Sequence, residues 1–303
     1  APPGRGLTTK QKRRRAILGA LAGSGHVEVL TYPFISETQN QMFSEGQPSV
    51  KLANALQAEF GEMRTTILPG LIEAARRNFS RGLTDLAIFE EGSVFLPTQT
   101  IVATGKLPVG NQLPSAEQLA TLNSTIPSQP SRLAAMFTGD RVNQGVGIQS
   151  QAISYQDAIQ AARFAAHAVG LELTVRQASP KGFHPGRSAD VYRDGACIGW
   201  IGQLHPRLQR ALDLDADVFA FELELVPLSA RALPRATELS RYPSVRRDLA
   251  FVVAEEVSWA ALAATARDAA GPLLRDVQLF DRYVGQGVES GQKSLAMGLI
   301  LQD

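Results

Sequence analysis

The chain has little cysteine, no long apolar run and almost no net charge. Its single cysteine, Cys197, leaves no internal disulfide to hold the fold and suits a cytoplasmic location. No apolar run approaches the roughly 20 residues that span a bilayer, so we expect no membrane segment. The formal net charge of +1 means that any contact with nucleic acid must come from a local basic patch.

Metal-ligand and signal-peptide patterns are also missing. His184 and His205 each precede a proline, and no cysteine or acidic group recurs near them at the spacing of metal ligands, so we expect no metal site. The basic amino end, APPGRGLTTKQKRRR, is not followed by the apolar stretch of a secretory signal. Its charge run is more typical of a solvated helix face than of a phosphate-binding site.

Enough apolar residues are present for ordinary globular burial, at 44% hydrophobic and 19% charged. A chain of 303 residues exceeds the usual size of one core, so we expect two domains, 1–232 and 240–303. Val226 to Leu239, with two prolines, is the predicted linker. Residues 98–130 are rich in Pro, Ser, Gln and Gly and predict an irregular insertion.

Local patterns predict several elements of the first domain. Met63-Arg64-Thr65-Thr66 leads into a helix with apolar residues at helical spacing, followed by a strand from Asp85 to Phe95. Near the amino end, a helix to about Ala22 should precede a strand from Val27 to Phe34. Asp194-Gly195 should turn a β-hairpin between residues 188–192 and 197–203.

The last part of the chain changes to a β-α-β-β pattern. Strands are predicted at Asp248 to Val253, Val277 to Tyr283 and Ser294 to Leu301, with a helix from Ser258 to about Ala270 after the first. This order is the first two-thirds of a ferredoxin-like fold. The pattern therefore predicts a domain that is incomplete at its end.

Several long segments together resemble the β subunit of bacterial phenylalanyl-tRNA synthetase. They are VKLANALQAEFGEMRTTILPGLIEAARRNFSRGLTDLAIFEEGSVF, HPGRSADVYRDGACIGWIGQLHP, RYPSVRRDLAFVV, LFDRYVG and GQKSLAMGLIL. Ala55 and Glu91 depart from the usual pattern of that family. The resemblance implies an α+β chain, with a class II synthetase-like antiparallel sheet and flanking helices, followed by a truncated ferredoxin-like βαββ domain that binds the anticodon.

The same resemblance implies an enzyme of two α and two β chains that joins phenylalanine to tRNA(Phe). ATP and Mg²⁺ are expected to serve the holoenzyme through the α subunit, with no cofactor bound by this chain. An adenylating site needs paired arginines and an acidic partner to bind ATP. Arg64 is followed by Thr65-Thr66 instead, and the strand from Cys197 to His205 carries no arginine. We therefore expect no catalytic residue here, and a structural role for Arg64.

Class II synthetases form dimers through a helix and a strand that carries a specific proline. Pro33 fits that position, since a proline cannot donate to a strand ladder and belongs at an edge or interface. The predicted subunit interface is Ile17, Leu18, Leu21, Tyr32, Pro33 and Phe34. The alternative is a surface helix beside an edge strand.

Cations and aromatics at the start of the terminal domain suit phosphate contact and base stacking on an unpaired anticodon loop. The predicted RNA-binding residues are Arg241, Tyr242, Arg246, Arg247, Tyr283 and Lys293. Phe251 and Phe280 could belong to that surface or to the core. Two other functions remain open: a free-standing synthetase-like protein that binds or regulates RNA, and an unrelated enzyme that uses the proline-rich insertion as a lid.

Overall fold

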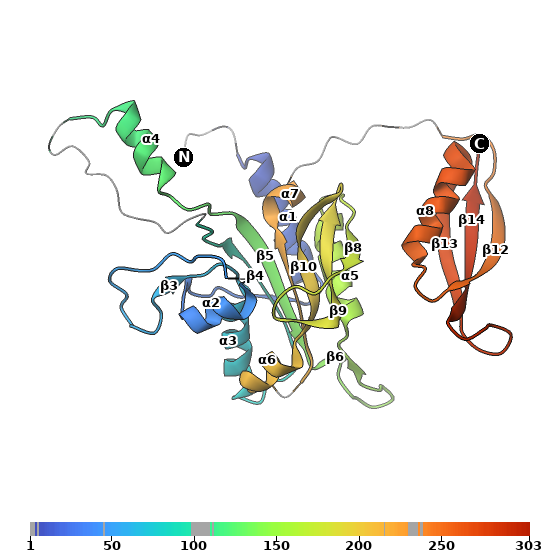
Figure 1. Ribbon diagram of the computed structural model, residues 1–303, viewed down its shortest axis with the longest axis horizontal. Coiled ribbons are helices and arrows are strands. Elements are labelled where there is room, and N and C mark those ends of the chain that lie inside the picture. Colours follow the sequence, from blue (N-terminus) through green and yellow to red (C-terminus); the bar gives the residue numbers. More distant parts are fainter. Residues whose placement is uncertain are drawn as a thin grey trace. The chain divides into compact units, whose positions relative to one another are not determined.

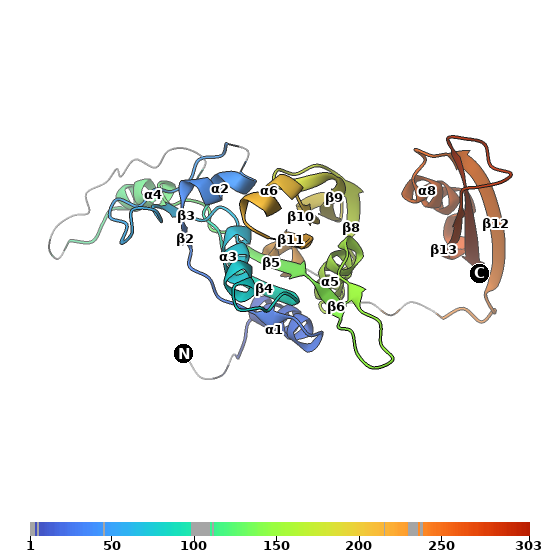
Figure 2. The ribbon, with the colours of Figure 1, turned by 90° about the horizontal axis from the view of Figure 1, so that it is seen from below.

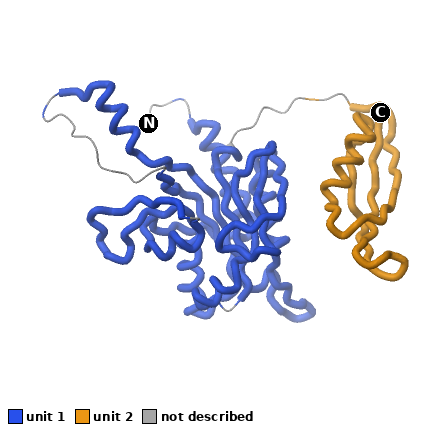
Figure 3. The backbone as a smooth tube through the Cα atoms, in the orientation of Figure 1, with its two compact units in different colours: residues 1–232 blue, residues 233–303 orange. Residues whose placement is uncertain are grey.

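The computed structural model describes residues 4, 6–44, 46–97, 110, 112–214, 216–229, 236 and 239–303. The chain divides into two compact units, residues 1–232 and 233–303 (Figure 3). Each is described below by itself. None of the helices in the described ranges is both long and apolar enough to cross a membrane.

Unit 1 is built on a seven-stranded sheet with the strand order β1-β4-β5-β11-β10-β9-β8 (Figure 1). Only the pair β1 and β4 is parallel, and the other neighbours are antiparallel, so the predicted α+β class with an antiparallel sheet is confirmed. The strands are β1 Val27–Glu28, β4 Leu86–Ser93, β5 Ser131–Thr138, β8 Thr174–Gln177, β9 Phe183–Arg193, β10 Ala196–Leu204 and β11 Val218–Glu224.

Helices cover both faces of this sheet, which explains why its central strands are almost wholly apolar. Successive residues of β5 alternate between two cores: Leu133 and Phe137 pack on one side, Ala134 and Met136 on the other. Helices α1 Thr9–Gly23, α5 Tyr155–His167 and α7 Leu225–Ser229 contribute to the first core, and α3 Leu68–Phe79 and α6 Pro206–Ala211 to the second (Figure 2).

The hairpin of β9 and β10 forms as its turn residues predict. Asp194 and Gly195 have φ angles of 48° and 82°. Two successive positive φ values are typical of a type I′ turn, whose twist matches that of the flanking strands. The Asp-Gly prediction is therefore confirmed by the backbone.

Two local predictions for unit 1 are wrong. The single strand expected from Val27 to Phe34 is two short ones, β1 and β2 Phe34–Ile35, and β2 pairs with β3 Glu62–Met63 in a separate sheet. The insertion expected to be irregular contains α4 Ala116–Ser124. A separate short helix, α2 Glu37–Phe43, lies between β2 and β3. Ser115 and Gln118 form a capping box that begins α4.

Some predicted segments fall on residues outside the described part. These are residues 98–109 and 111 of the insertion and residues 230–235, 237 and 238 of the predicted linker. The beginning of that linker forms α7. A further short hairpin, β6 Asp140–Val142 and β7 Gln151–Ala152, precedes α5.

Unit 2 has the predicted β-α-β-β order. Its elements are β12 Val245–Ala254, α8 Trp259–Ala270, the 3₁₀ turn Gly271–Leu273, β13 Leu274–Tyr283 and β14 Gln292–Leu301. The strands form a sheet in the order β12-β14-β13, and α8 packs on one face of it, with its Ala263 in one cluster with Val277 of β13 and Met297 of β14 (Figure 1). The central strand is therefore the last in sequence, as in the first three strands of a ferredoxin-like fold.

Candidate RNA-binding and subunit-contact surfaces

The sheet of unit 2 has one face under α8 and one open face. Met297 of β14 is buried under α8, and its partners across the sheet are Leu249 and Leu279. Because side chains alternate along a strand, residues one step away lie on the open face. Arg246, which pairs with Ile300, and Tyr283, which pairs with Ser294, belong to this open face.

Arg246 and Phe280 form an exposed pair of a cation and an aromatic ring on the open face. The Arg246 Cζ lies 5.3 Å from the centre of the Phe280 ring, which is 52% exposed. Asp248 Oδ1 accepts a hydrogen bond from Arg246 Nε at 2.8 Å and orients the guanidinium. A side chain at Gly298 would meet Arg246 at 3.0 Å, so glycine lets the arginine cross β14. The sequence did not decide whether Phe280 belongs to the core or to the surface. In the structure its side chain is half exposed.

Two of the predicted RNA-binding residues lie on the other face. Arg247 pairs with Leu299, whose side chain packs in the α8 core, so Arg247 is exposed but points to the side opposite Arg246. Lys293 is only 9% exposed, and its Nζ donates a hydrogen bond to the backbone oxygen of Glu255. This burial and hydrogen bond hold the ammonium group of Lys293 inside the unit and leave little of it to contact RNA.

The remaining predicted RNA-binding residues are accessible. Tyr242 is 65% exposed just before β12, and its backbone oxygen accepts a hydrogen bond from Gln302 at 2.7 Å. Arg241 beside it is also exposed. Tyr283 is 46% exposed and its hydroxyl donates to the oxygen of Gln286 at 3.2 Å. These contacts hold the segments in place and leave both rings available.

The apolar stripe of α1 is part of the core and not a contact surface. Ile17, Leu18 and Leu21 are at most 9% exposed and pack with α5, α7 and the sheet. Their burial leaves these three side chains almost no surface to offer to another subunit. The pattern was read correctly as amphipathic, but the surface that covers it comes from α5 and α7, more than a hundred residues later in the chain.

Tyr32 and Phe34 remain exposed, as do two other apolar residues of the same segment. Their exposed fractions are 83% and 41%, and Leu30 and Val27 nearby are 91% and 60% exposed. Pro33 between them is partly buried, and its oxygen accepts a hydrogen bond from the Arg64 nitrogen at 2.8 Å. Sequence reasoning missed Leu30 and Val27, although they stand in the same segment. We call Val27, Leu30, Tyr32 and Phe34 the amino-terminal patch.

Arg64 is enclosed by the protein, as its predicted structural role requires. Its Nη1 donates to Glu90 Oε1 at 2.7 Å and to Thr31 Oγ1 at 3.1 Å, and its Nε donates to the Ser93 oxygen at 3.0 Å. The side chain is 5% exposed and that of Glu90 is fully buried. The guanidinium therefore joins β4 to the loop before α3, through the carboxylate and backbone partners that the structural interpretation predicts.

Arg14, in the basic run at the start of α1, forms an ion pair with Glu91 of β4. Arg14 Nε and Nη2 donate to Glu91, and this hydrogen bond raises the pKa of Arg14. Glu91, one of the two departures from the family pattern, therefore has a local partner. Within the described ranges, no group of three or more His, Cys, Asp or Glu residues is placed to hold a metal ion.

Two family models match the chain. The "Phenylalanyl tRNA synthetase beta chain CLM domain" matches residues 1–225, and the "Ferredoxin-fold anticodon binding domain" matches residues 240–303. Among solved structures, pyrrolysyl-tRNA synthetase of Desulfitobacterium hafniense is similar at 16% identity and a TM-score of 0.48, covering 72% of this chain and 66% of that one.

Curated relatives are similar over nearly the whole chain. Phenylalanine–tRNA ligase β subunits are 47% identical over 91% of the chain in Xanthomonas campestris pv. campestris (strain 8004) and 41% identical over 99% in Leifsonia xyli subsp. xyli. The chain spans about a third of their length, 32% and 36%. Because the first family model alone covers residues 1–225 of 303, the chain belongs to the phenylalanyl-tRNA synthetase β chain family.

Proposed function

We propose that this chain supports assembly of a phenylalanine–tRNA ligase with a catalytic α subunit, in a complex of two α and two β chains, and that it binds the anticodon region of tRNA(Phe) in the cytoplasm. The relatives' name, a β subunit of a ligase, supports a multi-subunit enzyme. The match of residues 240–303 to an anticodon-binding domain supports the contact with tRNA.

The observation that carries the RNA proposal is the Arg246–Phe280 pair on the open face of unit 2. Unpaired bases stack on exposed aromatic rings, and an adjacent guanidinium adds phosphate contact or a cation–π interaction. Tyr283, on the same face, extends this surface, and Tyr242 and Arg241 add an exposed ring and cation at the start of β12. An open sheet face with these groups suits single-stranded RNA better than a duplex.

Charging with phenylalanine is assigned to the α subunit, together with ATP and Mg²⁺. Arg64 stands where an ATP-binding arginine would be sought. Its guanidinium already donates hydrogen bonds to Glu90, Thr31 and the Ser93 oxygen. A guanidinium that is buried and already paired cannot also clamp a phosphate without breaking those bonds. The chain's own residues thus favour a structural role for this site.

The amino-terminal patch is the surface that we assign to subunit contact. Val27, Leu30, Tyr32 and Phe34 lie within eight residues of sequence and are all at least 41% exposed. Contiguous exposed apolar groups on a soluble protein commonly mark a protein interface. Leu30→Asp and Tyr32→Asp in the co-expressed enzyme should reduce co-purification of the two subunits, whereas Leu56→Asp, at an equally exposed leucine elsewhere, should not.

Arg246 and Arg247 offer a matched test of the RNA surface, because the same charge is removed on opposite faces of one strand. In the assembled ligase, Arg246→Ala should weaken tRNA(Phe) binding and lower its salt slope by about one counterion. Arg247→Ala should have a smaller effect on both. Equal losses in the two variants, or unchanged binding by Arg246→Ala, would show that the open face is not the RNA surface.

A free-standing RNA-binding protein is distinguished by the same experiments. Stable binding of tRNA by this chain without an α subunit, together with no co-purification of α, would favour the free-standing alternative. Loss of tRNA binding when this chain is separated from the α subunit would favour its proposed role as a subunit of the ligase.

A further inference from the structure

Five of the first seven residues of α1 are basic, and this part of the helix stands clear of the core of unit 1. The five residues, which we call the basic segment, are Lys10, Lys12, Arg13, Arg14 and Arg15. None of the side chains from Thr9 to Ala16 is buried, whereas Ile17, Leu18 and Leu21 in the second half of the helix belong to the core. The rest of the chain has more acidic than basic residues, so this positive charge is local.

The basic segment opposes the electrostatics of the helix that carries it. The amino end of a helix bears a partial positive charge, which favours acidic side chains there and disfavours basic ones. The first turn of α1 has no acidic residue. Lys12 and Arg15, three positions apart, also repel each other. The capping box of Thr8 and Gln11 nevertheless holds the end of the helix in place. In natural proteins, local conflicts of this kind are expected at functional sites.

Three side chains of the basic segment have no counter-charge. Arg14 donates from Nε to Glu91 Oε2 at 2.7 Å. Lys10, Lys12 and Arg15 are exposed, and they make no side-chain hydrogen bond or ion pair to any residue that the structure describes. Because the capping box already occupies the backbone at the helix end, the groups on offer are these side chains.

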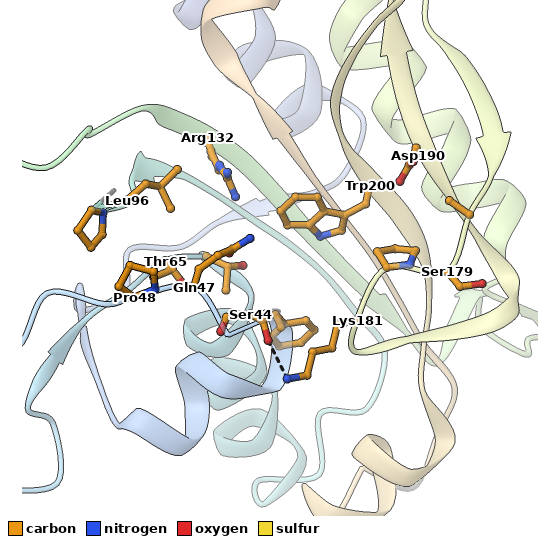
Figure 4. Close-up of a pocket in the computed structure, with 15 residues that line it drawn as sticks. Ser44, Gln47, Pro48, Thr65, Leu96, Arg132, Ser179, Lys181, Asp190 and Trp200 are labelled. Carbon is orange, nitrogen blue, oxygen red and sulfur yellow. Dashed lines mark hydrogen bonds between the residues drawn. The ribbon is translucent and has the colours of Figure 1, made fainter. Parts of the chain in front are cut away.

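Two cations at a cavity of unit 1 give a contrast. Lys181 Nζ donates to the Ser44 oxygen at 2.7 Å (Figure 4). Arg132, at the same cavity, donates from Nη1 to Glu222 Oε1 at 2.7 Å. An anion at that cavity would compete with partners inside the protein. At the three exposed cations of α1 it would displace only water.

The arrangement of the charges indicates which anion they suit. Successive residues of a helix are about 100° apart, so cations spread over six positions face several directions. Lys12 lies about 200° round the helix from Arg14, on the side away from Glu91. A flat acidic protein surface contacts one side of such a helix, whereas phosphates of two RNA strands can flank it on both sides. Stacking of an unpaired base needs an aromatic ring, and α1 has none.

We propose that the basic segment of α1 binds the sugar-phosphate backbone of paired RNA without regard to its sequence. This contact goes beyond the anticodon surface, because it lies on unit 1 and takes a duplex in place of unpaired bases. The open face of unit 2 offers the Phe280 ring for stacking, and α1 offers charge alone. The two surfaces together suit an RNA that has both loops and stems.

The test measures binding of the full chain to a fluorescein-labelled RNA duplex of about 16 base pairs and arbitrary sequence, the length that a duplex-binding domain spans. Anisotropy is recorded at several salt concentrations. The α1 variant combines Lys10→Gln, Lys12→Gln and Arg15→Gln, which keep helix propensity. Its affinity for the duplex should fall about tenfold or more, and its salt slope should fall by about two to three. A second duplex of unrelated sequence should give the same result.

A matched control removes the same charge from another helix of unit 1. The α3 variant combines Arg76→Gln, Arg77→Gln and Arg81→Gln, at three exposed arginines in and just after the last turn of α3. Both its duplex affinity and its salt slope should stay close to those of the unchanged chain. The comparison separates a specific surface from the general effect of lowering the net charge by three.

Folding stability separates binding from a structural role. Removing charges that oppose the helix dipole should raise the urea midpoint of unit 1 in the α1 variant, followed by Trp200 fluorescence in a Trp259→Phe background. A raised midpoint together with weaker duplex binding is the expected result. A raised midpoint with unchanged duplex binding would show a solvated face, and a lowered midpoint would show that these cations stabilise the fold. Either would overturn the proposal.

Three further results would also overturn it. These are the absence of saturable duplex binding by the unchanged chain, equal losses in the α1 and α3 variants, and displacement of the duplex by polyglutamate at an equal concentration of charge, which would indicate an acidic protein partner. Arg246→Ala, measured with an unpaired RNA of the same length, tests the surface of unit 2 separately. Failure of the α1 variant to lose duplex binding therefore leaves the proposed anticodon contact untouched.

Discussion

Truncating Leu21 tests whether α1 is part of the core of unit 1 or a surface reserved for a partner. Leu21 is 0% exposed and packs in the cluster that contains α5, α7 and the sheet. A fully buried leucine replaced by alanine loses its transfer free energy and leaves a cavity, so Leu21→Ala should lower the free energy of unfolding by about 2–5 kcal/mol. Leu30→Ala, at a leucine that is 91% exposed, should change it by less than about 0.5 kcal/mol.

The measurement is urea unfolding of the isolated chain, followed by tryptophan fluorescence in a Trp259→Phe background. Trp200 then reports on unit 1 alone, so the transition of unit 2 does not mask the difference. Comparison at constant m separates a loss of stability from a change in the denatured state. A Leu21→Ala loss below about 1 kcal/mol, or one equal to that of Leu30→Ala, would refute the assignment of α1 to the core.

Three further outcomes are expected. Arg64→Met should destabilise unit 1 by about 3–5 kcal/mol, because Glu90 is left buried without its partner; urea unfolding measures this, and a loss below about 1 kcal/mol would contradict it. Gly298→Val should displace Arg246 from Phe280 and weaken tRNA(Phe) binding by the assembled ligase, while the circular dichroism spectrum stays unchanged. Unchanged affinity for tRNA(Phe) would argue against RNA contact by the Arg246–Phe280 pair. Burial lowers the pKa of His26 below 6.5 and so favours its neutral form in the folded protein. The contribution of neutral His26 to folding stability is therefore complete above pH 6.5 and is lost as the pH falls below that value. His26→Gln should therefore make stability less dependent on pH between roughly 7 and 5, and identical pH profiles would rule this out.

Local patterns in the sequence were sufficient wherever the physics is local. The Asp194-Gly195 turn needs two positive φ values, and few other residue pairs supply them at low cost. The β-α-β-β order of unit 2 follows from short apolar strands around one capped helix, with Ser258 as its cap. Arg64 could be assigned a structural role because the residues that follow it are threonines.

Failures of prediction occurred where a segment's surroundings come from distant parts of the chain. The region Val27 to Phe34 was expected to be one strand, but its two ends pair with different partners, β4 and β3. Strand propensity indicates an extended segment and contains no information about which neighbour it meets. Helix α4 was missed because composition rich in Pro, Ser and Gln hid the capping box that begins it.

The sequence by itself determined the family resemblance, the α+β class and the residue types that suit RNA. Tertiary structure alone decided which of those residues are available. Neighbours on a strand point to opposite faces, so only the position of α8 separates Arg246 from Arg247, and only the packing of Lys293 against Glu255 removes its charge from the surface. An amphipathic stripe such as that of α1 shows that something covers it, but whether the cover is another subunit or α5 of the same chain depends on long-range contacts that periodicity cannot encode.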